Sequence, residues 1–235
     1  MKTLLRTSLA AAALFATAPL FAQTSDFPGA SDFPEIQRPT NAIAIGAMRI
    51  DMDEFVIPTG PVERSGSPRA GKSVTAQGSI DYLAYSGSTT TSSLATYTGL
   101  ATQVRAHGFK EIYSCARTTC GSAFTLDELL GQPVIASIHT GNWGHYMINS
   151  LNATNDDSRY GVFQKEGVYF LLLASLSPGE HAGALIIRIA NPPQPPILQS
   201  AAAAGPVGDS PAQPATNAAG QSLRSKARGW LSHVQ

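Results

Sequence analysis

The side chains of this chain that could carry chemistry gather in two places, and the first is a pair of cysteines. Cys115 and Cys120 are the only cysteines, spaced C-x4-C. In an oxidising compartment a pair this close most simply forms a disulfide. A loop of this size contributes only about 2 kcal/mol by a chain-entropy estimate. We therefore expect the bridge to hold its local turn rather than to join distant parts of the domain.

Two other uses of the cysteines remain open from sequence. A redox-active dithiol favours C-x-x-C at a helix start, which differs from the spacing here. A zinc site would need two more ligands, and His139 and His145 are the nearby histidines. Their H-x5-H spacing lies just outside the usual ligand range. The sequence favours a structural disulfide and predicts neither a metal site nor a cofactor.

The second place is an aromatic and polar stretch that contains Trp143, His145 and Tyr146. A tryptophan here could contact a ligand such as a sugar, but burial or a turn would equally use these residue types. Trp143 and His145, together with Asp157, support an alternative function as an envelope hydrolase or carbohydrate-binding module. The chain has no nucleophile elbow, P-loop, H-E-x-x-H or dinucleotide fingerprint, so no catalytic residue is predicted.

Strand patterns dominate the region that must position these residues. Apolar or alternating runs predict strands over 42–50, 54–57, 73–85, 109–114, 167–176 and 182–190. Gly78 shifts the alternation and suggests a bulge. Turn residues at 177–180 predict that the last two strands form a hairpin. A helical turn is expected at 124–130.

One good helix is predicted over 91–107. Ser92 or Ser93 can cap its start, and Gly108 is the expected left-handed residue after its end. A single helix among hairpin-connected strands predicts an α+β fold over residues 42–191. We expect a mainly antiparallel sheet that one principal helix covers on one face.

The segment before this domain has two parts. Residues 1–22 carry Lys2 and Arg6 ahead of a short apolar stretch and end in Ala22, which is typical of a cleaved signal peptide. Residues 23–41 contain two similar pentapeptides, Ser-Asp-Phe-Pro-Gly from Ser25 and Ser-Asp-Phe-Pro-Glu from Ser31. Their proline and aspartate content predicts an extended, irregular chain whose aromatic residues pack on the domain edge.

The segment after the domain changes composition abruptly. Residues 192–222 are rich in Ala, Pro, Gly, Ser and Gln, which predicts a disordered linker. Residues 223–235 could form a short basic amphipathic helix with Trp230 and Leu231 on its apolar face and Arg224 and Arg228 on its flank. Such a helix could contact a membrane surface or a partner, although an isolated helix this short is marginal in water, which favours a frayed tail.

Charge is balanced over the whole chain but not within its segments. The chain has 16 basic and 16 acidic residues, so it lacks the basic excess of a protein that binds nucleic acid by phosphate neutralisation. Residues 23–191 hold 11 basic and 15 acidic residues, whereas residues 192–235 hold three basic and one acidic. The sequence thus predicts a mildly acidic domain that carries a small basic C-terminal patch.

Several motifs occur in an order that resembles a known family. They are Glu54 to Gly60, the strand at 80–85, Tyr97, Gly108-Phe109, the C-x4-C-G of Cys115 to Gly121, and Asp157 to Tyr160 before a long apolar strand. Over residues 40–190 the chain resembles an uncharacterised family of Gram-negative envelope proteins, a domain of unknown function that often precedes an OmpA-type peptidoglycan-binding module. The resemblance implies an exported α+β domain with a local disulfide. No OmpA-type module follows Asn191, so peptidoglycan binding is not implied.

These features lead to one principal hypothesis about function. We expect an exported, non-catalytic protein of the periplasm or the outer-membrane surface that contacts other envelope components. After signal cleavage near Ala22 no stretch is long enough to span a bilayer. The expected contacts are envelope proteins or the outer-membrane surface, and not nucleic acid.

Overall fold

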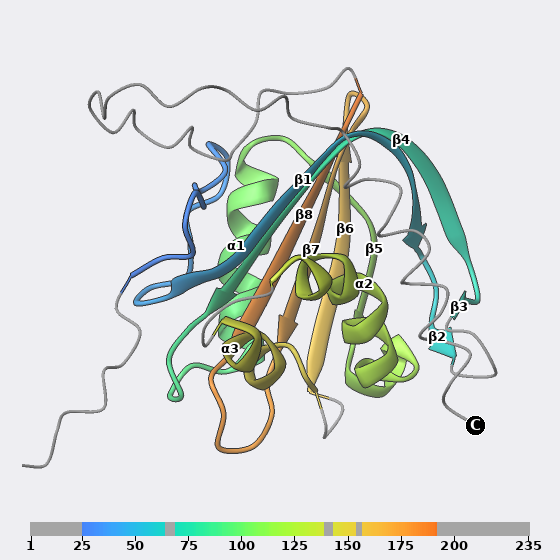
Figure 1. The fold of residues 1–235 in the computed structure, drawn as a ribbon. Helices are drawn as coiled ribbons and strands as arrows, with labels where there is room; N and C mark the ends of the chain where they lie inside the picture. Colours follow the sequence, from blue (N-terminus) through green and yellow to red (C-terminus); the bar gives the residue numbers. More distant parts are fainter. Residues whose placement is uncertain (1–24, 64–68, 139–142, 154–156, 192–235) are drawn as a thin grey trace, which may run out of the picture.

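The computed structural model describes residues 25–63, 69–138, 143–153 and 157–191 (Figure 1). Its strands and helices follow in the order β1 Ile43–Pro58, β2 Val62–Glu63, β3 Arg69–Ala70, β4 Ser73–Ser86, α1 Ser93–Ala106, β5 Lys110–Ala116, a 3-10 turn η1 at Arg117–Cys120, α2 Ala123–Ser137, α3 Trp143–Ser150, β6 Ser158–Lys165, β7 Val168–Ser175 and β8 Gly183–Ala190. The predicted signal peptide, linker and basic segment lie outside the described residues.

Six strands form one sheet in the order β1-β4-β8-β7-β6-β5, and every neighbouring pair is antiparallel. The predicted antiparallel α+β architecture is therefore confirmed. The expected hairpin between β7 and β8 is also present. A register shift in β1 lies between Ile50 and Asp53, and Asp53 pairs with Gly78, where the alternation of β4 had suggested a bulge.

The β1–β4 pair is longer than the rest of the sheet. β8 pairs with β4 from Ser79 to Ser86 only, so the remainder of the hairpin extends past β8 as two strands. We call this extension, residues 52–58 with 73–77, the ribbon. Figure 1 shows it bending away from the other strands toward the small β2–β3 sheet.

Helices cover both faces of the sheet, which gives the molecule three layers (Figure 1). α1 packs on β6, β7 and β8, while α2 and α3 pack mainly on β1 and β4 from the other side. Each face has its own apolar core: Leu100, Val104 and Phe170 belong to the first, and Leu126 and Met147 to the second. The expectation of one principal helix covering one face omitted α2 and α3.

Capping explains where α1 begins and ends. The hydroxyl of Ser92 accepts a hydrogen bond from the Ala95 amide at 3.1 Å, which pairs an otherwise free donor of the first turn. Gly108 follows the helix at a φ of 83°, a conformation that costs glycine little. Phe109 is then buried in the core beneath α1. This helix is two residues shorter at its start than predicted.

α2 is longer than the helical turn predicted at 124–130, although its sequence contains helix-weakening residues. Gly131 and Pro133 both lie within its 15 residues. A proline inside a helix removes one backbone hydrogen bond and ordinarily disfavours the helix by about 3 kcal/mol. Tertiary packing offsets this cost, because Val134 and Leu130 are buried against the sheet.

The two similar pentapeptides of the N-terminal segment, residues 25–41, each place an aspartate against the same arginine. Arg38 binds Asp26 at 2.6 Å and Asp32 at 2.9 Å, so both aspartates hold one guanidinium. The two phenylalanines pack separately, Phe27 against Trp143 and Phe33 against Phe170. The prediction that these aromatic residues pack on the domain is confirmed. The segment closes the α1 face beside the helix.

Candidate functional site

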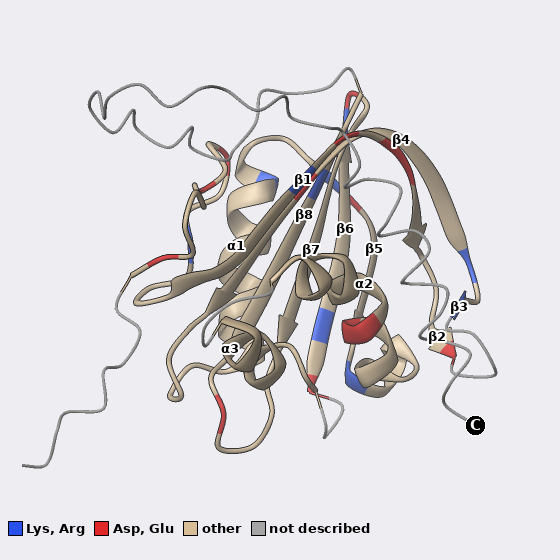
Figure 2. Ribbon diagram, viewed as in Figure 1, with Lys and Arg blue, Asp and Glu red and all other residues tan. Residues whose placement is uncertain are grey.

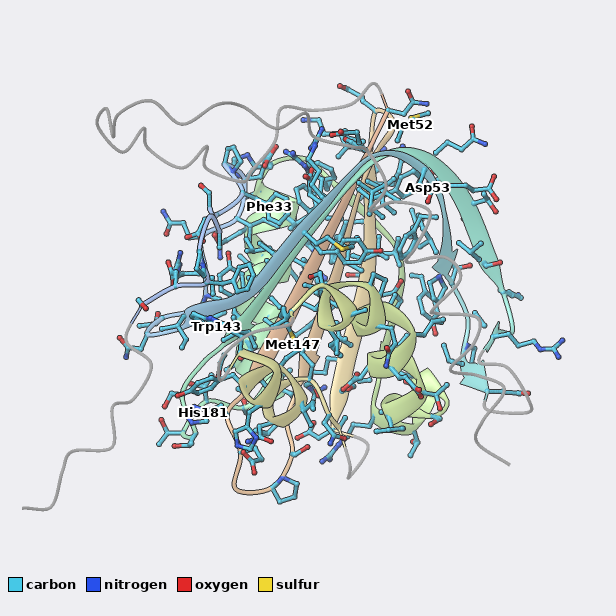
Figure 3. All side chains as sticks on the ribbon, viewed as in Figure 1. Phe33, Met52, Asp53, Trp143, Met147 and His181 are labelled. Carbon is cyan, nitrogen blue, oxygen red and sulfur yellow. A yellow bond between two sulfur atoms is a disulfide. The ribbon has the colours of Figure 1, made fainter. Side chains whose placement is uncertain are left out.

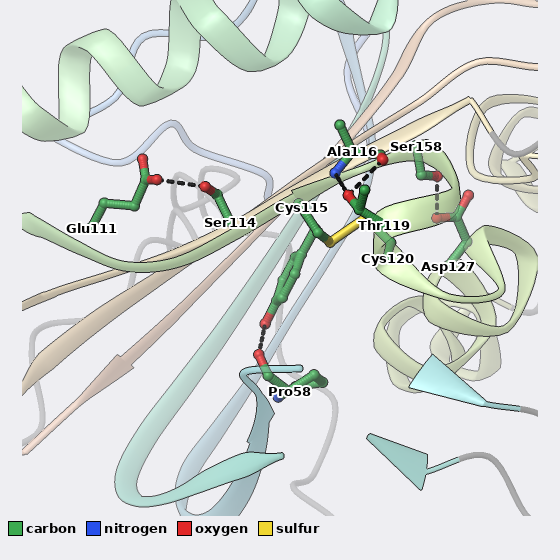
Figure 4. Close-up of a disulfide and its surroundings, with 10 residues drawn as sticks. Pro58, Glu111, Ser114, Cys115, Ala116, Thr119, Cys120, Asp127 and Ser158 are labelled. Atoms are coloured by element: carbon green, nitrogen blue, oxygen red, sulfur yellow. Dashed lines mark hydrogen bonds between the residues drawn. A yellow bond between two sulfur atoms is a disulfide. The ribbon is translucent and has the colours of Figure 1, made fainter. Parts of the chain in front are cut away.

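The two cysteines form a disulfide at the end of edge strand β5 (Figure 4). Their Cα atoms lie 5.0 Å apart, and Cys120 is fully buried. Inside the loop, the Thr119 hydroxyl accepts from the Ala116 amide at 2.9 Å and donates to the Ala116 carbonyl at 2.7 Å. Both cysteines are consumed in this bridge, as the spacing predicts, and the closed loop is a rigid turn.

This turn positions the start of α2. Gly121 has a φ of 83°, and a side-chain carbon there would lie 2.2 Å from the Val62 carbonyl oxygen. Only glycine fits this approach. The next amide, that of Ser122, donates to the same carbonyl at 2.9 Å, and the Ser122 hydroxyl accepts from the Thr125 amide at 3.2 Å. The bridge therefore acts on the fold by fixing where α2 begins.

Asp127 on α2 is a fully buried carboxylate on the same face of the sheet (Figure 4). Ser158 of β6 donates to it at 2.7 Å, Ser175 of β7 at 2.6 Å, and the Ala153 amide at 3.0 Å. These hydrogen bonds favour the ionised form, but burial outweighs them and raises the pKa of Asp127 to about 6. The carboxyl thus joins one helix to two strands and titrates near neutral pH.

A different charged group lies on the α1 face. Asp81 of β4 is fully buried between two arginines: Arg188 of β8 contacts one carboxylate oxygen at 2.8 Å and Arg49 of β1 the other at 2.7 Å. These residues are cross-strand neighbours in the register of the sheet. The guanidinium of Arg188 also lies 5.2 Å from the Phe33 ring centre. The N-terminal segment therefore covers a buried ion-pair network.

Sequence reasoning missed both buried charged groups, although a signal for them exists. Arg188 interrupts a strand that is otherwise entirely apolar, and Asp81 lies within the apolar run from Ile80 to Tyr85. A charge in such a strand must find a partner, because an unpaired buried charge is very costly. Asp127 gave a weaker signal, since one acidic residue on an amphipathic helix is ordinarily solvent-exposed.

The residues predicted as a ligand contact all lie at the start of α3. Trp143, which Figure 3 labels, is partly buried. The Phe27 ring meets it edge-on at a centroid distance of 5.6 Å. Tyr146 packs against the core of the same face. The Nε2 atom of His145 lies 3.2 Å from the Asn149 amide nitrogen, one turn along the helix. The structure gives Trp143 and Tyr146 packing contacts, and their role toward a ligand stays a prediction.

Asp157, the third residue of the alternative hydrolase or carbohydrate site, has other partners. The Ser93 hydroxyl donates to its carboxylate at 2.7 Å, and Arg117 lies 3.7 Å from the same oxygen. Ser93 belongs to α1 and Arg117 to the disulfide turn. Asp157 therefore contacts α1 and the disulfide turn. Trp143 contacts the N-terminal segment, and His145 contacts Asn149 within α3.

Two surface depressions lie on the described part of the domain. The larger, about 500 Å³, is lined by residues 26–32 and Arg38, whose charged groups already pair with one another. The smaller, about 190 Å³, lies between α3 and the β7–β8 turn. Its lining includes Asn152, whose side-chain oxygen is buried with no hydrogen-bond partner among the described residues.

Within the part of the chain that the structure describes, no three His, Cys, Asp or Glu side chains are grouped so that they could hold a metal ion. His139, the other histidine considered for zinc, is not among the described residues. The helices seen between residues 25 and 191 are too short or too polar to cross a membrane. No protein-family model matches the chain, and no curated protein is significantly similar to it.

Proposed function

We propose that this protein is an exported, non-catalytic component of the bacterial cell envelope that contacts other envelope components, in the periplasm or at the outer-membrane surface. Residues 1–22 have the pattern of a cleaved signal peptide, and the basic segment 223–235 would make one of the contacts. The folded domain would present that segment on the linker of residues 192–222.

The observation that carries this proposal is the disulfide. Cys115 and Cys120 are the only cysteines of the chain, and both are paired. Disulfides persist in oxidising compartments and are rare where glutathione and thioredoxin keep thiols reduced. A bridge with a buried cysteine at the start of α2 supports a protein that folds after export.

The two fully buried carboxylates among the described residues are held in structural positions and do not suggest a catalytic pair. Asp81 and Asp127 are fully buried, and each is held by side chains that tie strands or helices together. Catalytic carboxylates need access to a substrate, ordinarily in a well-formed cleft. These two carboxylates therefore fit structural roles.

Fractionation of cells tests the proposal directly. The full chain is expected in the periplasmic or envelope fraction, resistant to thiol alkylation until a reductant is added. A variant that ends at Asn191 should keep the export and the disulfide but lose part of its envelope association. Cys115→Ser provides the control for the alkylation readout. A full chain found reduced in the cytoplasm would contradict export, and equal association of both forms would contradict the role of the C-terminal segment.

A further inference from the structure

The outer face of the ribbon carries an exposed strip that differs from its inner face. On the inner face, Phe55 and Ile57 pack on the core beneath α2. Side chains alternate along a strand, so Glu54 and Val56 point the other way, and Met52 precedes them within the register shift between Ile50 and Asp53. Met52 is 59% exposed and Val56 57% exposed. The strip thus offers two apolar side chains with a carboxylate between them.

The charge of the ribbon is concentrated at its base, where it leaves the sheet. Glu54 accepts a hydrogen bond from Gln77 at 3.2 Å and remains exposed. Asp51 directly precedes the strip, and its side chain is 93% exposed although it also contacts Arg49. Figure 2 shows acidic residues of β1 at this bend, whereas Lys72 directly precedes β4 at the far end and Arg69 belongs to β3. A basic ligand would therefore meet the base of the ribbon first.

The chain leaves the folded domain beside this base. A side-chain carbon at Gly78 would lie 2.2 Å from the Ala190 carbonyl oxygen, so the end of β8 lies against the residue that pairs with Asp53. Figure 3 labels Met52 and Asp53 at this bend. From Asn191, a flexible linker of about 30 residues has a root-mean-square span of about 30 Å. The ribbon is only about 20 Å long at 3.3 Å per residue, so residues that follow the linker can reach all of it.

We propose that the basic amphipathic segment 223–235 docks in cis on the outer face of the ribbon. Arg224 and Arg228 would face Glu54 and Asp51, and the apolar face with Trp230 would cover Met52 and Val56. The apolar area is small, so the contact would be weak between separate molecules. A short flexible linker, however, gives an effective concentration in the millimolar range, and this populates a weak intramolecular contact. Because an isolated helix of this length is marginal in water, docking would also stabilise a helix in the segment.

Docking in cis would regulate the segment that the proposed function uses for envelope contact. The same arginines and the same apolar face cannot bind the ribbon and an anionic surface at once. Anionic lipid or a partner would therefore compete with the ribbon for residues 223–235. This inference shares its segment with the proposed function, but it concerns the folded protein alone and holds whether or not envelope association is found.

Trp230 reports on the contact in the full chain. The only other tryptophan is Trp143, and Trp143→Phe removes its signal while keeping an aromatic ring against Phe27. In that background we expect Glu54→Lys or Val56→Ser to raise the acrylamide quenching constant of Trp230 by about twofold, since the indole loses its cover. Arg228→Glu should act alike, and adding Arg228→Glu to Glu54→Lys should restore part of the protection.

Matched controls separate docking from general effects of charge and polarity. Glu63→Lys makes the same charge change on the β2–β3 sheet, and Leu94→Ser makes a similar polarity change on exposed α1. Neither should alter quenching of Trp230. Equal quenching in all variants would overturn the proposal. Protection that appears only with anionic phosphatidylglycerol vesicles, and is the same in Glu54→Lys, would also overturn it, because the segment would then bind lipid but not the ribbon. Failure of envelope fractionation would leave these results unchanged.

Discussion

The two faces of the sheet bury charge in different ways. On the α1 face, each oxygen of the Asp81 carboxylate contacts an arginine. The N-terminal segment has the reverse arrangement, in which two aspartates bind the single guanidinium of Arg38. On the α2–α3 face, Asp127 has three neutral hydrogen-bond donors and no counter-ion among its hydrogen-bond partners. Both arrangements join elements distant in sequence, but only the first compensates charge with charge.

This difference decides which face responds to pH. An ion pair keeps its carboxylate charged near neutrality, as with Asp26, where the hydrogen bond from Arg38 lowers the pKa despite partial burial. Neutral donors compensate less, so desolvation prevails at Asp127. We therefore expect substitution of an ion-pair partner on the α1 face to lower the free energy of unfolding. On the α2–α3 face, we expect the free energy of unfolding to depend on pH.

Removing the charge of Asp81 should have the largest effect. Asp81→Asn removes the carboxylate that Arg188 and Arg49 share inside the sheet, and breaking a buried pair in this way costs about 3–5 kcal/mol. Urea unfolding measures the loss. The control is Asp51→Asn, because Asp51 also contacts Arg49 but is almost fully exposed; it should cost at most about 1 kcal/mol. Equal losses would show that the buried network is not what stabilises the α1 face.

Asp127 should make stability depend on pH between about 4 and 7. Its pKa of about 6 in the folded protein lies above the ordinary 3.8, so the folded state binds the proton more tightly. The stability contributed by the neutral carboxyl is fully present below pH 4 and is lost as the pH rises through 6, by about 3 kcal/mol at 1.36 kcal/mol per unit.

Asp127→Asn tests this dependence, since the amide has a similar shape but does not titrate in this range. Urea unfolding of the variant should show a flatter dependence of the free energy of unfolding on pH over the same window. Asp81→Asn serves as the comparison on the other face and should keep the slope of the native protein. A slope that persists in Asp127→Asn would assign the pH dependence to another group.

The smallest effect is expected at Arg38, which is partly exposed. Arg38→Ala removes the shared partner of Asp26 and Asp32 and should cost about 1 kcal/mol of global stability. Locally, the Ala44 amide, which donates to Asp26 at 2.9 Å, should exchange its hydrogen faster. Arg38→Lys keeps the charge but loses the planar fork and should give an intermediate rate. Unchanged exchange would indicate that the packing of Phe27 and Phe33 alone holds the N-terminal segment.

Local sequence patterns were sufficient to predict the elements whose signals lie within a few neighbouring residues. The alternation of β4, the turn residues between β7 and β8, and the cap and glycine around α1 all correspond to what the structure shows. The disulfide also followed from the close spacing of the only two cysteines. β6 was not identified as a strand, since Gly161 and several polar residues obscure its alternation.

The sequence by itself thus determined an antiparallel sheet with one capped helix, a local disulfide and the segregation of charge between domain and C-terminal segment. The tertiary structure alone decided that α2 forms despite Pro133, because burial of Leu130 and Val134 outweighs propensity. It also decided which partners the buried carboxylates have: Asp81 binds Arg188 across 107 positions, and Asp127 accepts from Ser175 across 48. Such partners are set by strand order and register, which no local pattern contains.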